Sequence, residues 1–72
     1  MKRSELNKVK RARRMISIYL LLRRTDTPLK KLAKKYAVNA RSIQRDLKLL
    51  REAGATIDKG PFGYYVDKKV DQ

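Results

Sequence analysis

Long side chains with several hydrogen-bonding groups are concentrated between Asn39 and Arg51. An arginine such as Arg41 can donate two parallel hydrogen bonds, and an amide such as Gln44 can donate and accept at once. These groups suit recognition of a polar or anionic surface. The chain holds no His and no Cys, which excludes disulfides, thiolate metal sites and the usual nucleophile–base pairs. With seven scattered Asp and Glu residues, we expect no enzyme, no metal site and no cofactor.

The charge balance indicates a polyanionic partner. Twenty Lys and Arg residues stand against seven Asp and Glu, giving a net charge of +13 over 72 residues. Such an excess costs self-repulsion and is best matched by a nucleic acid or, less well, by an anionic membrane surface. The longest apolar run, residues 15–22, is too short for a span of about 20 residues. We therefore expect one soluble domain that binds nucleic acid, not membrane, and that is cytoplasmic and nucleoid-associated.

A first helix is predicted over residues 5–24, with Ser4 as its N-cap and no Gly or Pro to interrupt it. Helical spacing predicts a core-facing stripe made of Leu6, Val9, Ile16, Tyr19 and Leu20. A second stripe consists of Met15, Ile18 and Leu22. Two interpretations of this second stripe stay open: a helix that is buried on a broad front, or a homodimer contact through this helix.

A second and a third helix are predicted over residues 28–36 and 40–53, joined by a turn at 37–39. Thr27 is expected to cap the second helix, with Pro28 at its first helical position. Asn39 is a good N-cap for the third helix, and Gly54 a good C-cap. One arc of the third helix is apolar, with Ile43, Leu47 and Leu50. The opposite side carries Arg41, Arg45, Lys48 and Glu52, with Gln44 on its shoulder.

The tail, residues 55–67, changes to the alternation of two short strands around a turn at 58–63. Tyr64 and Val66 should share one face of this hairpin, and Tyr65 the other. For Phe62 in the turn, packing against the hairpin or a partner is preferred over insertion into a groove. The order of elements predicts an α+β, mainly α, winged helix-turn-helix: three helices and a C-terminal β-hairpin wing, in a single domain over residues 1–72.

Several motifs also resemble the DeoR-type winged helix of bacterial transcription regulators, which is shared by biotin-repressor-like proteins. The matching pieces are Leu32-Ala33, Val38-Asn39, Arg41-Ser42-Ile43-Gln44-Arg45-Asp46-Leu47, Leu50, Gly54 and Gly63-Tyr64. Asn39 and Ser42 stand where the family usually has Ser and Thr, and both keep a capping or hydroxyl function. No sensor domain follows Gln72 in this sequence, so we expect no small-molecule effector.

The resemblance implies sequence-preferring binding to double-stranded DNA, in transcription control, with the third helix in the major groove. Arg41 and Gln44 are expected at base edges, and Arg45 at a base edge or a phosphate. The expected DNA-binding set is Asn39, Arg41, Ser42, Gln44, Arg45, Lys48, Arg51, Lys59, Lys8 and Arg11. Alternatives remain for some of these residues: Gln44 as an ordinary exposed residue, Ser42 as part of the first helical turn, and Arg45 in a salt bridge with Asp46 or Glu52.

Asp46 would repel phosphate if it faced DNA, so we expect it to orient Arg45 or to pair with another cation. Two alternative functions stay open. One is a phage or plasmid accessory protein, or an architectural protein, that acts in a larger complex. The other is a winged helix that binds RNA or the ribosome, because the fold does not dictate the ligand.

Overall fold

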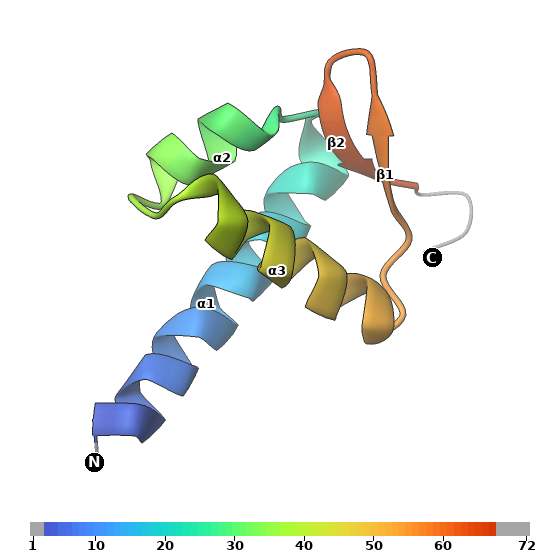
Figure 1. Cartoon of the computed structure of the whole chain (residues 1–72). Helices are drawn as coiled ribbons and strands as arrows, with labels where there is room; N and C mark the ends of the chain where they lie inside the picture. The colour runs from blue at the N-terminus through green and yellow to red at the C-terminus, as the bar shows by residue number, and fades with distance from the viewer. Residues whose placement is uncertain (1–2, 68–72) are drawn as a thin grey trace.

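The computed structural model describes residues 3–67 of the chain, and side chains from residue 5 onward. Three helices are followed by an antiparallel hairpin of two strands, which confirms the predicted winged helix-turn-helix (Figure 1). The elements are α1 (Arg3–Arg24), α2 (Leu29–Lys35), α3 (Ala40–Glu52), β1 (Ile57–Gly60) and β2 (Gly63–Val66). α1 begins at Arg3, and the capping role predicted for Ser4 concerns a side chain outside the described set.

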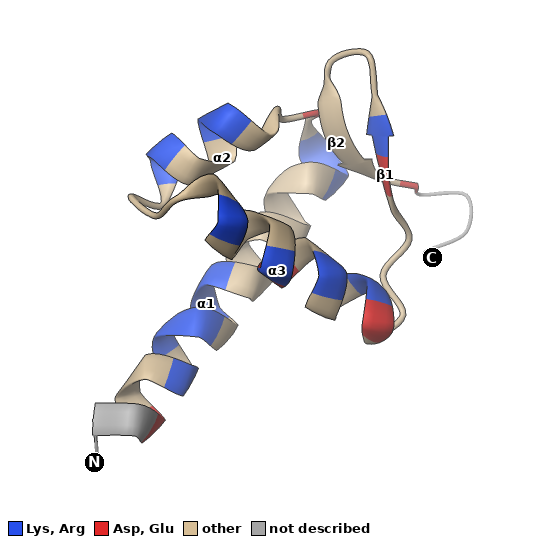
Figure 2. Cartoon of the chain, in the orientation of Figure 1, with Lys and Arg blue, Asp and Glu red and all other residues tan. Residues whose placement is uncertain are grey.

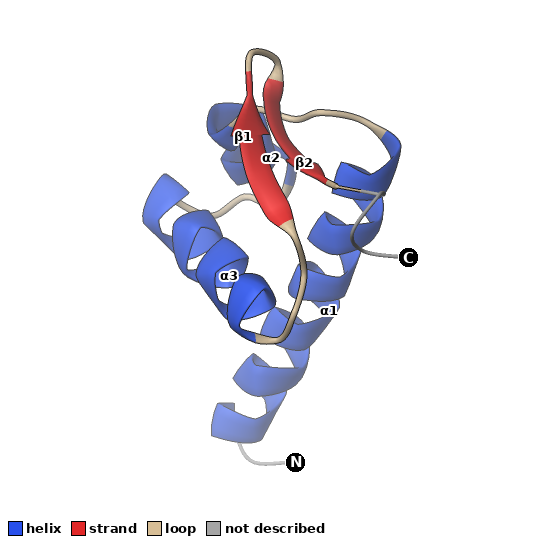
Figure 3. Cartoon of the chain, turned by 90° about the vertical axis from the view of Figure 1, so that its right-hand side faces the viewer, coloured by secondary structure: helices blue, strands red, loops and turns tan. Residues whose placement is uncertain are grey.

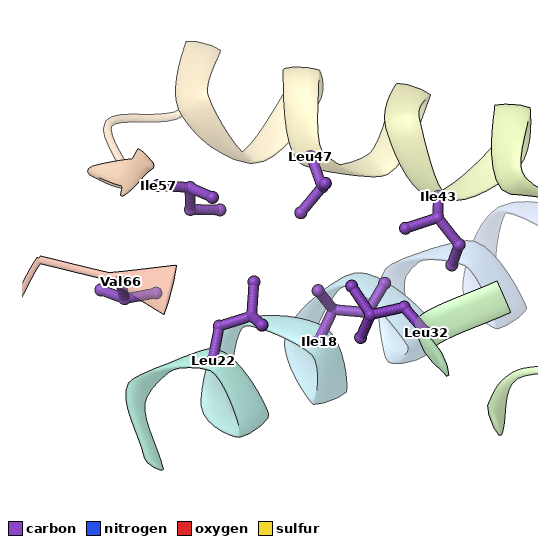
Figure 4. Packing of buried hydrophobic residues seen from close by; sticks show 7 residues of the cluster. All are labelled: Ile18, Leu22, Leu32, Ile43, Leu47, Ile57 and Val66. Carbon is purple, nitrogen blue, oxygen red and sulfur yellow. The ribbon is translucent and has the colours of Figure 1, made fainter. Parts of the chain in front are cut away.

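One apolar core joins all five elements. Its buried members are Ile18, Leu22, Leu32, Ile43, Leu47, Ile57 and Val66 (Figure 4). α1 and α3 face each other across this core, and the two strands close one end of it (Figures 3 and 4). Tyr64 packs partly against the core and Tyr65 is not among the residues that do, as the predicted alternation requires. The wing is therefore part of the folded body, not an appendage to it.

The structure distinguishes the two apolar stripes of α1: the second is buried, which agrees with one of its two interpretations, whereas the stripe predicted to face the core is mostly exposed. Ile18 and Leu22 are buried, at 0% and 2% exposure, and Met15 is half-buried. These residues therefore cannot form the predicted dimer contact, because the core of the same chain covers Ile18 and Leu22. The stripe predicted to face the core is exposed at Leu6, Val9, Ile16 and Leu20, and only its Tyr19 packs partly against the core. Both stripes have helical spacing, so periodicity alone could not decide which one the domain covers.

The helix-turn-helix differs from the prediction in small details. α2 starts at Leu29, and Pro28 is the extended residue before it (φ −68°, ψ 153°) rather than the first helical residue. The Thr27 hydroxyl does not cap α2; it donates to the carbonyl oxygen of Thr25 at 3.3 Å. After α2, Ala37 takes a left-handed conformation (φ 54°), and the amide of Val38 donates to the Ala33 carbonyl at 3.1 Å. This bond closes the helix end and turns the chain toward α3.

The wing is tighter than predicted and is attached to the linker between α1 and α2. The strands pair as far as Gly60 and Gly63, which leaves a turn of two residues, Pro61 and Phe62. Thr27 exchanges two backbone hydrogen bonds with Tyr64, of 3.0 Å and 2.9 Å, and so pairs with β2 as an isolated antiparallel bridge. Gly63 makes this contact possible: its φ is +124°, and a Cβ there would lie 2.3 Å from the Thr27 carbonyl carbon.

Candidate nucleic-acid interface

α3 buries one side in the domain and presents polar and basic side chains on the other. Ile43, Asp46 and Leu47 are buried. The exposed positions between and beside them are Arg41, Gln44, Arg45 and Lys48. The structure thus brings together four of the predicted contact residues on one exposed helical surface, and Lys and Arg positions recur along α3 (Figure 2).

The start of α3 is fixed by its cap. The side-chain oxygen of Asn39 accepts a hydrogen bond from the backbone amide of Ser42 at 2.9 Å, as expected for an N-cap residue. Ser42 is half-buried in the first turn, while Asn39 is exposed. Asn39 and Ser42 therefore stabilise the N-terminus of α3, where its exposed surface begins.

The rotation of α3 is fixed by an ion pair with α1. Arg14 donates from Nε to Oδ2 of Asp46 at 2.5 Å and from Nη2 to Oδ1 at 3.1 Å. Asp46 is 1% exposed and the Arg14 side chain 19%. The hydrogen bond to Asp46 raises the pKa of the Arg14 guanidinium above its ordinary value, although burial opposes this rise. The predicted structural role of Asp46 is confirmed, with Arg14 rather than Arg45 as its partner.

Sequence reasoning did not single out Arg14, but a signal for it exists. Asp46 lies on the same arc of α3 as Ile43 and Leu50, at helical spacing from both. A carboxylate on the inward side of a helix needs a cation from a neighbouring element, because burying a lone charge is costly. The inward position of Asp46 therefore predicts a basic partner on another helix.

Arg51 has a task inside the fold that was not predicted. Its Nε donates to the carbonyl oxygen of Ile57 at 2.9 Å, which connects the last turn of α3 to the first residue of β1. The residue is nevertheless exposed. Arg51 thus couples the position of the wing to the exposed surface of α3.

The wing tip presents a cation and an aromatic ring. Lys59 is exposed, with its Nζ 5.9 Å from the centre of the Tyr64 ring. Phe62 is 75% exposed, so it does not pack against the wing; packing against a partner, the other half of the expectation, stays a prediction. A turn of only two residues leaves its side chain no part of the hairpin to cover it.

The remaining predicted contacts, Lys8 and Arg11, lie in the N-terminal half of α1. Every residue from 5 to 13 is exposed there, and this half of the helix extends beyond the rest of the domain in both views (Figures 1 and 3). The structure therefore places these two cations apart from the α3 surface, on a separate projecting segment.

Among the residues described, no helix combines the length and the apolar character needed to cross a membrane.

Comparison with known proteins identifies the domain type. A family model described as HTH domain matches residues 11–65, a range that runs from the middle of α1 to the second strand of the wing. None of the curated proteins and none of the solved structures gives a significant match. Since the family model spans most of the chain and the fold agrees with it, the chain belongs to the helix-turn-helix family of DNA-binding domains.

Proposed function

We propose that this protein is a small, non-catalytic transcriptional regulator of the DeoR type that binds double-stranded DNA with a sequence preference and acts at the nucleoid. The observation that carries the proposal is the division of α3 into a buried side and an exposed side with Arg41, Gln44, Arg45 and Lys48. A major groove about 12 Å wide admits one such helix.

The exposed side chains of α3 have the chemistry for reading bases. In helix-turn-helix docking the N-terminal turns of the recognition helix contact base edges, and Arg41 and Gln44 lie in those turns. An arginine can bond O6 and N7 of guanine, and a glutamine N6 and N7 of adenine. Asn39 and the half-buried Ser42 hold the helix start, so their contribution to binding is mainly the position of Arg41 and Gln44.

Cations outside the first turns of α3 are assigned to the phosphate backbone. Five such cations are exposed: Lys8 and Arg11 on α1, Lys48 and Arg51 on the later turns of α3, and Lys59 on the wing. Phosphate contacts fix the register of a protein on the duplex but carry no sequence information directly. They therefore supply affinity and its salt dependence, while Arg41 and Gln44 supply discrimination.

The proposal is tested by selecting bound sites from random DNA duplexes with the wild-type chain and then measuring variants on the selected site and on a scrambled one. Arg41→Ala and Gln44→Ala should each lose about 1–3 kcal/mol of discrimination at one base position. Lys8→Ala and Arg11→Ala should weaken binding to both duplexes equally and lower the salt slope by about one each. Arg24→Ala, which removes an exposed charge at the other end of α1, is the matched control.

Two results would contradict the proposal. If Arg41→Ala distinguished the two duplexes as well as the wild-type chain does, α3 would not be the reading helix. If a structured RNA displaced the selected duplex at equal concentration, the proposed ligand class would be wrong, because the fold serves RNA as well as DNA.

A further inference from the structure

The exposed side of α1 carries an apolar seam, defined here as Leu6, Val9, Arg13, Ile16 and Leu20. Successive members are three and four residues apart in alternation, the spacing of the contact line between two packed helices. Its four apolar members are 37% to 60% exposed. The core residues Ile18 and Leu22 lie on the opposite side of the helix, so the seam is a second apolar side that the domain does not cover.

We infer that this seam is a homodimer interface in which the α1 helices of two copies pack antiparallel. The contact goes beyond DNA binding and needs no DNA to form. It uses a different side of α1 from the one that packs inside each domain, so both domains stay intact when it forms.

The shape of α1 supplies the first argument for a second copy as the occupant. Leu6 and Val9 lie on the projecting half, where all residues from 5 to 13 are exposed, whereas Ile16 and Leu20 lie on the half that is attached to the domain. A projecting segment of this length gains little helix stability by itself. Each copy therefore has both an apolar segment without support and an apolar ridge without cover.

An antiparallel register supports the projecting half of each helix and covers the apolar ridge of the other. When Val9 is set opposite Leu20 of the second copy, Arg13 falls opposite Ile16 of the second copy, and the two-fold axis repeats both pairs. The projecting half of each helix then lies along the attached half of the other. Between Leu6 and Leu20 the seam is about 21 Å long at the rise of an α-helix.

The surroundings of Ile16 supply the second argument. It separates two shallow hollows, one of about 410 Å³ bordered by Leu20 and Leu21, and one of about 380 Å³ bordered by Leu50 and Ala53. A ridge with a hollow on each side can pack against a copy of itself, as an isologous interface requires.

Charge determines the conditions in which the dimer is seen. Each copy carries a net charge of +13, so two copies repel each other at low ionic strength and less so at high ionic strength. Within the seam Arg13 is the only charged member, and its long stem can keep the guanidinium in water while the stem packs. Raising the salt from about 0.1 M to about 0.5 M NaCl should therefore strengthen the dimer, although it weakens DNA binding.

Sedimentation equilibrium of the full chain without DNA tests the interface. Arg13→Leu fills the seam and should tighten the dimer about tenfold, because a polar residue at such a position costs stability. Arg11→Leu removes the same charge from an exposed position off the seam and should change the dimer only slightly. Ile16→Lys should weaken the dimer at least about tenfold, whereas the charge-matched Leu49→Lys on α3 should not. All four positions are exposed, so unchanged thermal unfolding verifies the fold of each variant.

Disulfide trapping tests the orientation, since the chain has no Cys of its own. In the antiparallel register a mixture of Val9→Cys and Leu20→Cys chains should cross-link as a heterodimer, and neither variant should cross-link efficiently with itself. Efficient self-cross-linking of each variant would instead indicate parallel helices and overturn the register. A chain that stays monomeric at both salt concentrations, with Arg13→Leu behaving like Arg11→Leu, would overturn the interface itself.

Discussion

Removing Arg14 should destabilise the domain more than removing its partner Asp46. Asp46 is 1% exposed, whereas the Arg14 side chain is 19% exposed and lies nearer to solvent. Arg14→Met therefore leaves a buried carboxylate without a cation, which costs about 3–5 kcal/mol. Asp46→Asn keeps the shape and one acceptor, and the arginine can turn toward water, so about 1–2 kcal/mol should be lost. A domain of this size has a total stability of only about 4–11 kcal/mol.

Two further variants separate charge from geometry. Arg14→Lys keeps the positive charge but cannot reproduce the two parallel hydrogen bonds to Oδ1 and Oδ2, so its cost should fall between those of the other two changes. Replacing both residues, Arg14→Met with Asp46→Leu, removes the pair and its desolvation together. The double variant should lie within about 1 kcal/mol of the wild-type chain.

Urea denaturation followed by far-ultraviolet circular dichroism measures these differences. Because the pKa of Arg14 is raised in the folded state, Arg14 stabilises the fold fully below the ordinary pKa of arginine. This stabilisation is lost only as the pH rises through the raised pKa. Arg14 therefore stays protonated over the neutral range, and the comparison can be made there. If Asp46→Asn cost more than Arg14→Met, or if both cost less than about 0.5 kcal/mol, the pair would not be what holds α3 against α1.

Four smaller changes test local features of the fold by thermal denaturation. Gly63→Ala should cost about 3 kcal/mol, because the new Cβ would collide with the backbone of Thr27 in addition to the strain of a positive φ. Gly54→Ala has the same strain with nothing within 4 Å, and should cost only about 1–2 kcal/mol; equal losses would argue against the collision. Asn39→Ala removes the cap and should cost about 1 kcal/mol, or roughly 4–8 °C in Tm, so an unchanged Tm would count against it. Phe62→Ser should leave the free energy of unfolding within about 0.5 kcal/mol of the wild-type value, since the ring is 75% exposed, and a larger loss would show a packing role.

The order and type of the elements could be predicted because local signals agree with the fold. Asn39 caps α3 and Gly54 follows its end in a left-handed conformation, as their residue types indicate. The apolar arc of α3 at Ile43 and Leu47 is buried as its spacing predicts. Each of these features depends on residues within one or two helical turns.

The larger errors concern contacts between residues that are far apart in the sequence. Thr27 has the chemistry of a helix cap, but its backbone pairs with Tyr64, and nothing near Thr27 specifies that partner. Likewise, the stripe of α1 with Ile18 and Leu22 is buried because it belongs to a core with residues of α2, α3 and the wing, which are far away in the sequence. Periodicity locates a stripe on a helix but does not identify the element that covers it.

The candidate site was predicted where it depends on one helix and missed where it depends on packing. Arg41, Gln44, Arg45 and Lys48 required only the helical period of α3, and all four are exposed. The tasks of Arg14 and Arg51 depend on the arrangement of α1 and β1 beside α3. The spacing within α3 can indicate that Asp46 needs a basic partner, but it does not identify Arg14 as that partner and gives no indication of the Arg51 bond.

α1 also shows how one helix can serve three surfaces. Arg11 lies about two turns before Ile18 on the same side of the helix, so the side that is apolar inside the domain becomes basic where the helix projects beyond it. A basic side there cannot contribute to a core, but it can contact phosphate without disturbing the core. The opposite side stays apolar from Leu6 to Leu20, except for Arg13. Because the basic side and the seam are different sides of α1, a second copy can cover the seam while Lys8 and Arg11 remain free to bind DNA. The dimer and the DNA complex should therefore form together rather than compete.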